Sequence, residues 1–216
     1  MSNLDLTVID YGIGNLHNVV RALQHCGANV TLIDDASQIK TLPERLVLPG
    51  VGAFAGGMRE IQNRGFDDLI KRYVCTERPF LGICVGAQML FDVGEEFGNH
   101  SGLGLISGRV KAVPAFSVSS KRHRIPHIGW SCLEAGGLEQ TWRNTILDGV
   151  NLGAAVYFVH SYAIYPDKQE DQLAMTYYNG IPICAAVRRN NIYGCQFHPE
   201  RSADVGLQIL KSFMLI

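Results

Sequence analysis

A cysteine, a histidine and a glutamate have the types and spacing needed for nucleophilic chemistry. Cys84 lies in the segment GICVG (82–86), after an apolar run and before a stretch of helical composition. A glycine two positions away on each side is typical of a nucleophile elbow, a sharp strand-to-helix turn that exposes the reactive side chain at the end of a sheet. The structural alternative is a buried cysteine in an ordinary glycine-containing turn.

The segment HPE (198–200) supplies the partners that a thiol nucleophile needs. His198 and Glu200 are separated by one residue, so in an extended segment their side chains point the same way. Glu200 can then hold the imidazole in one tautomer while His198 exchanges a proton with Cys84. Histidine beside proline is common on surfaces, but combined with the cysteine elbow the pattern predicts a thiol acyl-transfer triad.

A third segment, LPGVGAF (48–54), predicts a glycine-rich turn at the end of a strand. Ligands bind at the carboxyl edge of open α/β sheets, where such a turn leaves backbone N–H groups free. We expect the N–H of Gly52 and that of Val85 to form an oxyanion hole. Taken alone, the segment is equally compatible with an ordinary strand-to-helix loop.

Alternating strands and helices in the first half must position these residues. We expect strands within 6–12, 29–34, 45–50 and 80–84, and helices over 15–27, about 57–74 and 86–96. Such alternation predicts parallel strands joined by right-handed crossovers and covered by helices on both faces.

The second half is mostly strand-like. Plausible hairpin turns occur at Asn179-Gly180 and Asn190-Asn191, and a helix is expected at about 203–214. No repeat or linker is visible. The sequence therefore predicts a single domain over 1–216, with a flavodoxin-like open mixed sheet: a parallel core flanked by helices, and antiparallel strands added in the second half.

Composition excludes several function classes. The net charge of −1 gives no reason to expect a nucleic-acid or acidic-membrane partner, and the basic cluster KRHR (121–124) predicts a solvated loop. No apolar segment approaches the ~20 residues of a membrane span, and the start lacks a secretion signal, so a cytoplasmic protein is expected. The six cysteines show no metal spacing, and neither metal nor cofactor is expected; apart from Cys84 they are interpreted as reduced core residues.

These motifs together resemble those of the class I (triad-type) glutamine amidotransferases. Further segments resemble the glutaminase subunits that supply a (β/α)₈-barrel cyclase in histidine biosynthesis: DYGIGNL (10–16), LPGVGAF (48–54), PHIGWS (126–131) and YFVHSY (157–162). The likeness runs from about residue 5 to residue 213. It rests on the order and spacing of the motifs rather than on any single one.

The resemblance implies hydrolysis of glutamine to glutamate and ammonia through a γ-glutamyl thioester on Cys84. It also implies a set of residues that hold the glutamine: Gly50, Gln88, Glu96, His160, Ser161 and Tyr162. Structural alternatives remain open for three of them. Gln88 could be structural, although its place one helical turn after Cys84 lets it reach the site, Glu96 could be a solvated charge at a helix end, and His160 could be a satisfied buried histidine.

The resemblance further implies a heterodimer with the cyclase, with a partner interface at Pro126, His127, Trp130, Tyr157 and Arg201. Trp130 could equally be a core residue. Arg201 replaces the lysine that is usual in the family, and Ile128 and Ser131 replace methionine and asparagine. The chain leaves no room for a domain that consumes ammonia, so a second polypeptide is expected to accept it. We expect the isolated chain to be nearly inactive until the Val51–Gly52 peptide turns its N–H toward the substrate.

Three other functions compete with this one. The same chemistry could serve a paralogous amidotransferase of surface-glycan sugars, or a stand-alone thiol hydrolase of γ-glutamyl peptides, which would turn over without a partner. A non-catalytic binding module would need a broken triad, which this sequence does not show.

Overall fold

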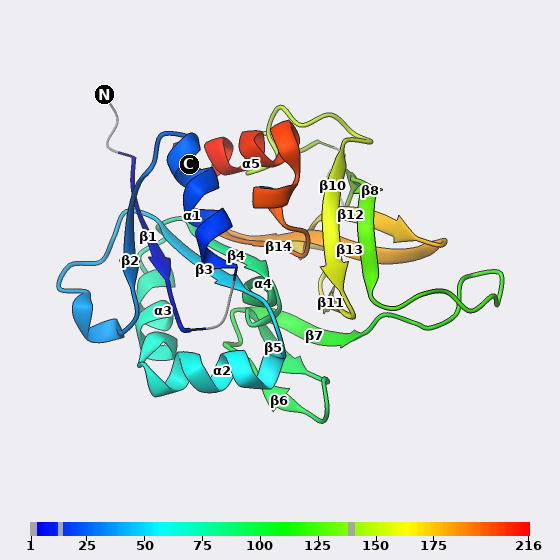
Figure 1. Cartoon of the computed structure of the whole chain (residues 1–216), viewed down its shortest axis with the longest axis horizontal. Helices are drawn as coiled ribbons and strands as arrows, with labels where there is room; N and C mark the ends of the chain where they lie inside the picture. Colours follow the sequence, from blue (N-terminus) through cyan, green and yellow to red (C-terminus); the bar gives the residue numbers. More distant parts are fainter. Residues whose placement is uncertain (1–3, 13–14, 138–140) are drawn as a thin grey trace.

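The computed structural model describes residues 4–12, 15–137 and 141–216 (Figure 1). Five parallel strands form the main sheet from its β2 edge inward: β1 (Asp5–Ile9), β2 (Asn29–Ile33), β3 (Leu46–Gly50), β4 (Phe80–Cys84) and β14 (Ile192–Cys195). They lie side by side in the order β2-β1-β3-β4-β14. This is the flavodoxin-like order, which confirms the predicted fold class.

Helices cover both faces of this parallel core. They are α1 (Leu16–His25), α2 (Phe54–Asn63), α3 (Phe66–Val74) and α5 (Ala203–Leu215). Figure 1 shows α1 beside α5 on one side of the sheet, and α2 beside α3 on the other. The helix expected at about 57–74 is divided in two at Gly65, which has a φ of 69°. The glycine-rich turn expected before α1 includes Ile13 and Gly14, which lie outside the described residues.

Antiparallel strands extend the second half, as predicted. Three of them continue the main sheet beyond β14, in the order β13 (Ile181–Arg189), β12 (Gln172–Tyr178) and β9 (Glu134–Ala135). β10 (Ala155–His160) pairs with β8 (His127–Cys132), and a four-stranded sheet contains β11 (Tyr162–Pro166), β7 (Ile106–Ala112), β5 (Phe91–Gly94) and β6 (His100–Ser101). Short 3₁₀ helices are η1 (Ala36–Gln38), η2 (Gln169–Asp171) and η3 (Pro199–Arg201). Both expected hairpin turns are present, at 179–180 and 190–191.

The helix predicted over 86–96 is wrong in length. Helix α4 spans only Val85–Gln88, and the chain then enters β5, which pairs with β6 and β7. Residues 89–90 form a turn, and β5 is extended because its backbone groups pair with β6 and β7. Its residues, Phe91–Gly94, are also weak helix formers, so local propensity does not oppose the strand.

Some of the expected core residues lie at the surface. Cys75 and Cys132 are exposed, so the interpretation of every cysteine besides Cys84 as a core residue is wrong for these two. The basic segment at 121–124 belongs to a loop that projects from the molecule between β7 and β8, in line with the prediction of a solvated loop (Figure 1). None of the described helices is long and apolar enough to cross a membrane.

Helix α4 crosses β3 so closely that its second residue has no room for a side chain. A Cβ on Gly86 would collide with the backbone carbonyl of Leu48, and a Cβ on Gly82 would meet the carbonyl oxygen of Gly86 at 2.7 Å. These obstacles are backbone atoms, which cannot rotate away as a flexible side chain can. The two glycines beside the cysteine are therefore required by the crossing of strand and helix, as the sequence predicts.

Replacing Gly86 by alanine tests this crossing. Gly86→Ala should lower the free energy of unfolding by about 3 kcal/mol, because the added methyl group forces β3 and α4 apart. Gly56→Ala is the matched control, since a Cβ at Gly56 in α2 has open space around it. That control should raise stability by up to about 1 kcal/mol, because alanine is the better helix former. Urea unfolding of both variants measures the difference, and equal stabilities would contradict the close crossing.

Candidate active site

Cys84 has a strained backbone at the carboxyl end of β4. Its φ and ψ are 54° and −110°, a conformation that residues with a side chain rarely adopt. Strain of this kind costs about 1–3 kcal/mol and persists only where the surrounding structure imposes it. Here Cys84 is followed at once by α4, so the turn is a strand-to-helix elbow. The thiol sulfur lies 4.0 Å from the carbonyl oxygen of Val159 in β10.

His198 and Glu200 come together after β14, although Glu200 lies in η3 rather than in the extended segment that the sequence predicts. The Nδ1 of His198 donates to Oε1 of Glu200 at 2.8 Å, and the two side chains are only 3% and 1% exposed. The backbone holds the histidine as well, because its N–H donates to the carbonyl of Tyr157 at 2.9 Å and its carbonyl accepts from the hydroxyl of Ser202 at 2.7 Å. The carboxylate thus fixes the tautomer that leaves Nε2 available.

The cysteine and the histidine act on each other electrostatically. Burial alone would lower the pKa of His198, but the neighbouring sulfur of Cys84 and the carboxylate of Glu200 outweigh it and raise this pKa to about 10. The Nε2 atom of His198 has no hydrogen-bond partner among the described residues. A buried imidazole nitrogen without a partner, next to a thiol, can take or return a proton during a reaction.

Both residues line one cavity of about 260 Å³. The cavity brings together most of the predicted site residues: Gly52, Cys84, Val85, Gln88, Glu96, Pro126, His160, Ser161, Tyr162 and His198. They come from the ends of β3 and β4, from α4, from the turn after β5 and from the junction of β10 and β11. A larger hollow of about 610 Å³ lies elsewhere, lined by charged residues such as Lys168 and Arg188, and none of the described residues that line it is a cysteine.

Gln88 has one amide group oriented by the protein. Its Nε2 donates to the carbonyl of Tyr162 at 2.9 Å and to Oε1 of Gln196 at 3.3 Å. Both N–H groups are therefore used, and the amide oxygen is the atom left for a ligand in the cavity. Gln196 is fully buried and is not among the predicted site residues. Gln196 stands two residues before His198, so alternation along an extended segment after β14 points to it, but that rule does not reach Glu200, which lies in η3.

Glu96 lies in the turn after β5 rather than on a helix. One carboxylate oxygen, Oε2, accepts from the backbone N–H of Phe54 at 2.8 Å. Phe54 is the first residue of α2, whose cap residue Ala53 makes no side-chain cap, so Glu96 satisfies an N–H that the helix itself cannot. The carboxylate also borders the cavity, which leaves Oε1 available to a cationic group.

The predicted oxyanion donors occupy adjacent walls of the cavity. Gly52 follows β3 with a φ of 88°, and Val85 is the first residue of α4. A rotation of the Val51–Gly52 peptide plane would change the φ of Gly52, and glycine tolerates both signs of φ because it has no Cβ. Gly50, in contrast, does not line the cavity. A Cβ there would meet the hydroxyl of Tyr11 at 2.5 Å and the nitrogen of Gly86 at 2.7 Å, so its smallness serves packing.

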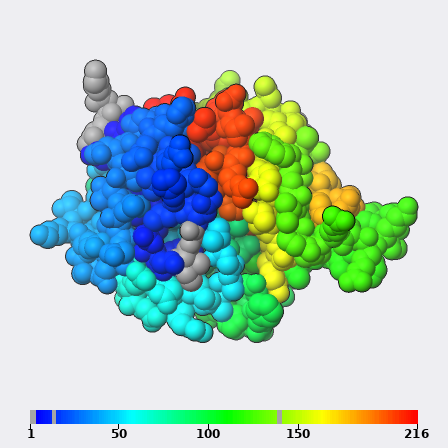
Figure 2. Space-filling view, viewed as in Figure 1, coloured from blue at the N-terminus to red at the C-terminus, as the bar shows by residue number. Residues whose placement is uncertain are grey.

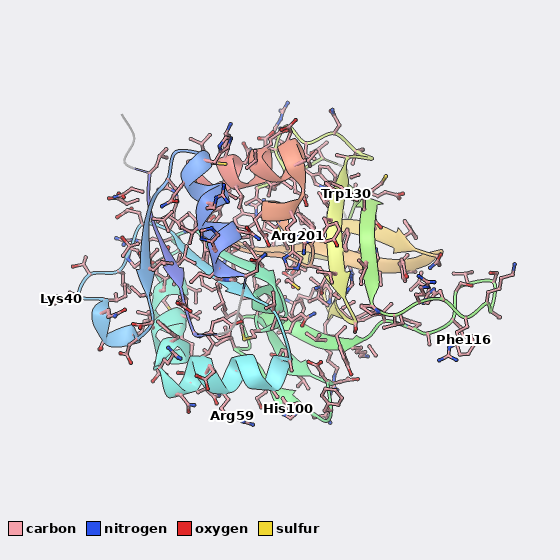
Figure 3. All side chains as sticks on the ribbon, in the orientation of Figure 1. Lys40, Arg59, His100, Phe116, Trp130 and Arg201 are labelled. Atoms are coloured by element: carbon pink, nitrogen blue, oxygen red, sulfur yellow. The ribbon has the colours of Figure 1, made fainter. Side chains whose placement is uncertain are left out.

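Of the predicted partner-facing residues, His127 is misplaced. It is 1% exposed, so the prediction that it faces a partner is wrong. The antiparallel pairing of β8 with β10 turns His127 inward, while Trp130 on the opposite face of β8 is 55% exposed. Trp130 packs edge-on against Tyr157, with ring centroids 6.0 Å apart, and the guanidinium of Arg201 lies 4.5 Å from the Tyr157 ring centroid. Figure 3 labels Trp130 and Arg201, which lie near β8 and β10.

Sequence comparisons relate almost the whole chain to one enzyme family. The family described as glutamine amidotransferase class-I matches residues 7–216. A protein named imidazole glycerol phosphate synthase subunit HisH 1 from Legionella pneumophila (strain Lens) is 45% identical over 98% of this chain and 99% of its own length. A protein named imidazole glycerol phosphate synthase subunit HisH from Desulfitobacterium hafniense (strain DSM 10664 / DCB-2) is 41% identical over 95% of this chain and 92% of its own length.

Solved structures share the fold at lower identity. The structure of PurLQS from Thermotoga maritima superposes with a TM-score of 0.72 at 16% identity, covering 98% of this chain and 97% of that chain. The crystal structure of a glutamine amidotransferase from the same organism superposes with a TM-score of 0.60 at 16% identity, covering 93% of this chain and 77% of that chain. These likenesses support the fold alone.

Removing the thiol tests whether Cys84 contacts His198. In Cys84→Ala one of the two neighbours that raise the pKa of His198 is gone while burial still acts to lower it, so this pKa should fall below its native value of about 10. Titration of the imidazole by NMR measures it. The exposed Cys75→Ala variant should leave the value unchanged. A native value equal to that of Cys84→Ala would mean that the two groups do not interact.

The raised pKa of His198 also makes the stability of the fold depend on pH. The folded-state pKa of His198 is above the unfolded value of 6.5, so protonation of the folded chain contributes stability that is fully present below about pH 6.5. That contribution should be lost as the pH rises through about 10. Urea unfolding of the native chain between these pH values should show the loss, and Cys84→Ala should show a smaller one.

Proposed function

Because the chain belongs to the class-I glutamine amidotransferase family, we propose that it is a glutaminase that releases ammonia from the side-chain amide of glutamine. The observation that carries this proposal is the cavity shared by Cys84 and His198. A strained cysteine, an imidazole and an orienting carboxylate form the set that thiol acyl transfer requires. Glutamine offers the amide on which that set can act.

The first half of the reaction forms a thioester. Nε2 of His198 takes the proton of the Cys84 thiol as the sulfur attacks the γ-carbonyl carbon, and the carbonyl oxygen becomes an oxyanion that the N–H groups of Gly52 and Val85 stabilise. His198 gives a proton to the amide nitrogen, the C–N bond breaks, and ammonia leaves. The γ-glutamyl group stays on Cys84. Glu200 stabilises the imidazolium that carries the proton before this transfer.

The second half regenerates the enzyme. His198, now neutral, takes a proton from a water molecule whose oxygen attacks the thioester carbonyl. The same N–H groups stabilise the second oxyanion, the C–S bond breaks, the sulfur takes the proton from His198, and glutamate leaves. The net reaction consumes one glutamine and one water and yields glutamate and ammonia.

The walls of the cavity fit the two ends of a free glutamine. The free oxygen of Glu96 can accept hydrogen bonds from the α-ammonium group, and the amide oxygen of Gln88 can accept from a substrate N–H. The backbone at 160–162 forms the opposite wall. We assign these groups to substrate binding, in place of Gly50, which is outside the cavity.

The acceptor of the ammonia is proposed to be a (β/α)₈-barrel cyclase subunit, and the product imidazole glycerol phosphate in histidine biosynthesis. Support comes from the relatives named as subunits of imidazole glycerol phosphate synthase, which match 98% and 95% of the chain. The cluster of Trp130, Tyr157 and Arg201 would face this partner. Arg201 stands where the family usually has lysine. Its planar guanidinium lies over the Tyr157 ring, a contact that the compact ammonium of a lysine would not reproduce.

The surface around this cluster is suited to a protein partner. Ile128 and Trp130 of β8 are both more than half exposed, and Phe116 and Val118 project on the loop before it. Figure 2 shows this loop extending from the body of the molecule, next to the column formed by β8 and β10. We place the heterodimer interface here, and the whole complex in the cytoplasm. Turnover by the isolated chain is proposed to be low until the partner turns the Val51–Gly52 peptide.

Mutation of the nucleophile tests the function. In the complex of this chain with a barrel cyclase, Cys84→Ala should abolish glutamine-dependent synthesis, by a factor of about 10⁴ or more, because no thioester can form. Synthesis with added ammonium salt should remain, because the cyclase then needs no glutaminase. Synthesis assays with each nitrogen source measure both activities. If the variant loses both, the chain does more than supply ammonia.

The partner requirement separates the remaining alternatives. Glutaminase activity is measured for the native chain in three mixtures: alone, with a histidine-pathway cyclase and its nucleotide ligand, and with a paralogous cyclase for glycan sugars. Strong turnover should appear only with the histidine-pathway cyclase. Rapid turnover by the chain alone would favour a stand-alone γ-glutamyl hydrolase instead. Activation only by the second cyclase would move the function to glycan synthesis.

A further inference from the structure

A chain of side-chain hydrogen bonds runs from the surface strand β8 to the wall of the cavity. Ser131 Oγ lies 3.0 Å from Nε2 of His127, and Nδ1 of His127 lies 3.0 Å from Nε2 of His160. Nδ1 of His160 lies 2.9 Å from the carbonyl oxygen of Tyr162. The first residue is partly exposed, and the two histidines are buried. His127 and His160 are directly opposite each other in the β8–β10 ladder.

The positions of the protons in this hydrogen-bond chain follow from its last group, the carbonyl oxygen of Tyr162. A carbonyl oxygen only accepts, so Nδ1 of His160 must carry a hydrogen. Burial lowers the pKa of His160 to about 3, so the ring is neutral near pH 7 and its Nε2 is an acceptor. His127 must therefore donate from Nδ1. Burial likewise lowers its pKa to about 4, so its own Nε2 accepts from the hydroxyl of Ser131.

Packing holds the first imidazole in the plane that this chain needs. The His127 ring stacks on Phe158, with centroids 4.8 Å apart, and on Tyr178, with centroids 4.2 Å apart. The hydroxyl of Tyr178 is occupied elsewhere, because it donates to the carbonyl of Arg124 at 2.7 Å. The ring contacts fix the orientation of His127, and the hydrogen bonds fix its tautomer.

The last group of this hydrogen-bond chain, the Tyr162 carbonyl, is part of the proposed substrate site. The carbonyl oxygen of Tyr162 accepts from His160 and also from Nε2 of Gln88, at 2.9 Å in each case. Both of its lone pairs are therefore used, and the backbone at 160–162 is tied to the side chain of Gln88. Releasing His160 from this carbonyl would free one wall of the cavity and loosen the amide that faces the substrate.

We propose that His127 is a positioning residue for the glutaminase reaction: it donates to Nε2 of His160, holds that ring in the Nδ1–H tautomer, and thereby fixes the Tyr162 carbonyl and Gln88 in the geometry that binds glutamine. His127 itself does not touch the substrate, because it does not line the cavity. Ser131 and His127 lie on one face of β8, and Ile128 and Trp130 lie on the other. The strand proposed to face the partner is thus also the strand that orients the pocket. This role rests on the proposed function.

Two substitutions at His127 separate the hydrogen bond from the packing. His127→Phe keeps a flat ring between Phe158 and Tyr178 but has no donor for His160. His127→Asn places an amide N–H near the position of Nδ1 and so keeps a donor. Tyr178→Phe is the control for the surrounding packing, since it keeps the stacked ring and loses only the surface hydrogen bond to Arg124.

The first measurement needs no substrate. In ¹⁵N NMR spectra of the full chain, His160 should show a protonated Nδ1 and an unprotonated Nε2, and so should His127→Asn and Tyr178→Phe. In His127→Phe the partner of Nε2 is gone, and the Nε2–H tautomer of His160 should appear. A native His160 protonated on Nε2, or a His127→Phe spectrum like the native one, would overturn the proposal.

The second measurement follows alkylation of Cys84 by a diazoketone analogue of glutamine, compared with alkylation by iodoacetamide. For His127→Phe, the apparent dissociation constant of the analogue should rise about tenfold, because an oriented hydrogen-bonded wall is lost. The maximal rate and the iodoacetamide rate should change less than about twofold, and both His127→Asn and Tyr178→Phe should behave as the native chain does. Unchanged binding in His127→Phe, or a loss as large in His127→Asn, would contradict the positioning role.

These experiments distinguish a failure of the proposed glutaminase function from a failure of the positioning role of His127. If glutamine does not protect the native Cys84 from the analogue, the proposed glutaminase function fails. The tautomer of His160 still tests the series of hydrogen bonds in that case, because it is measured on the protein without ligand.

Discussion

The strained backbone of Cys84 is the constraint on which the site depends. A φ of 54° at a residue with a side chain is held in place by the close crossing of β3 and α4, where Gly82 and Gly86 leave no space for a Cβ. The turn directs the thiol into the cavity at the carboxyl end of the sheet. It also makes Val85 the first residue of a helix, whose backbone N–H has no partner within that helix. One local geometry thus supplies both the nucleophile and a candidate oxyanion donor.

The parts of the fold that depend on local patterns could be predicted from the sequence. The four parallel strands of the first half, the hairpin at 179–180 and the C-terminal helix each have a local signal in hydrophobic periodicity or turn residues. The helix predicted over 86–96 is wrong beyond Gln88, where the chain turns and β5 pairs with β6 and β7. Such partners are distant in sequence, and periodicity within a short window does not reveal them.

The site shows the same division. Cys84 and His198 can be found from the sequence because glycine spacing and the HPE tripeptide are local signals, whereas Glu200 reaches His198 from η3 and not by strand alternation. The prediction of a surface position for His127 is wrong, although alternation along β8 already separates it from Trp130 and puts the two on opposite faces. Gln196 is not among the predicted site residues, although it stands only two residues before His198. The link from His127 to His160 could not be predicted, because it needs the register of β8 against β10.

The most direct test of this account is to look for the acyl group itself. The native chain, mixed with its cyclase partner and glutamine, is quenched in acid during turnover, digested and analysed by mass spectrometry. The account predicts a γ-glutamyl thioester on the peptide that contains Cys84, which disappears when the quenched sample is treated with hydroxylamine. Turnover of glutamine with no adduct at Cys84, or with an adduct on another residue, would contradict it.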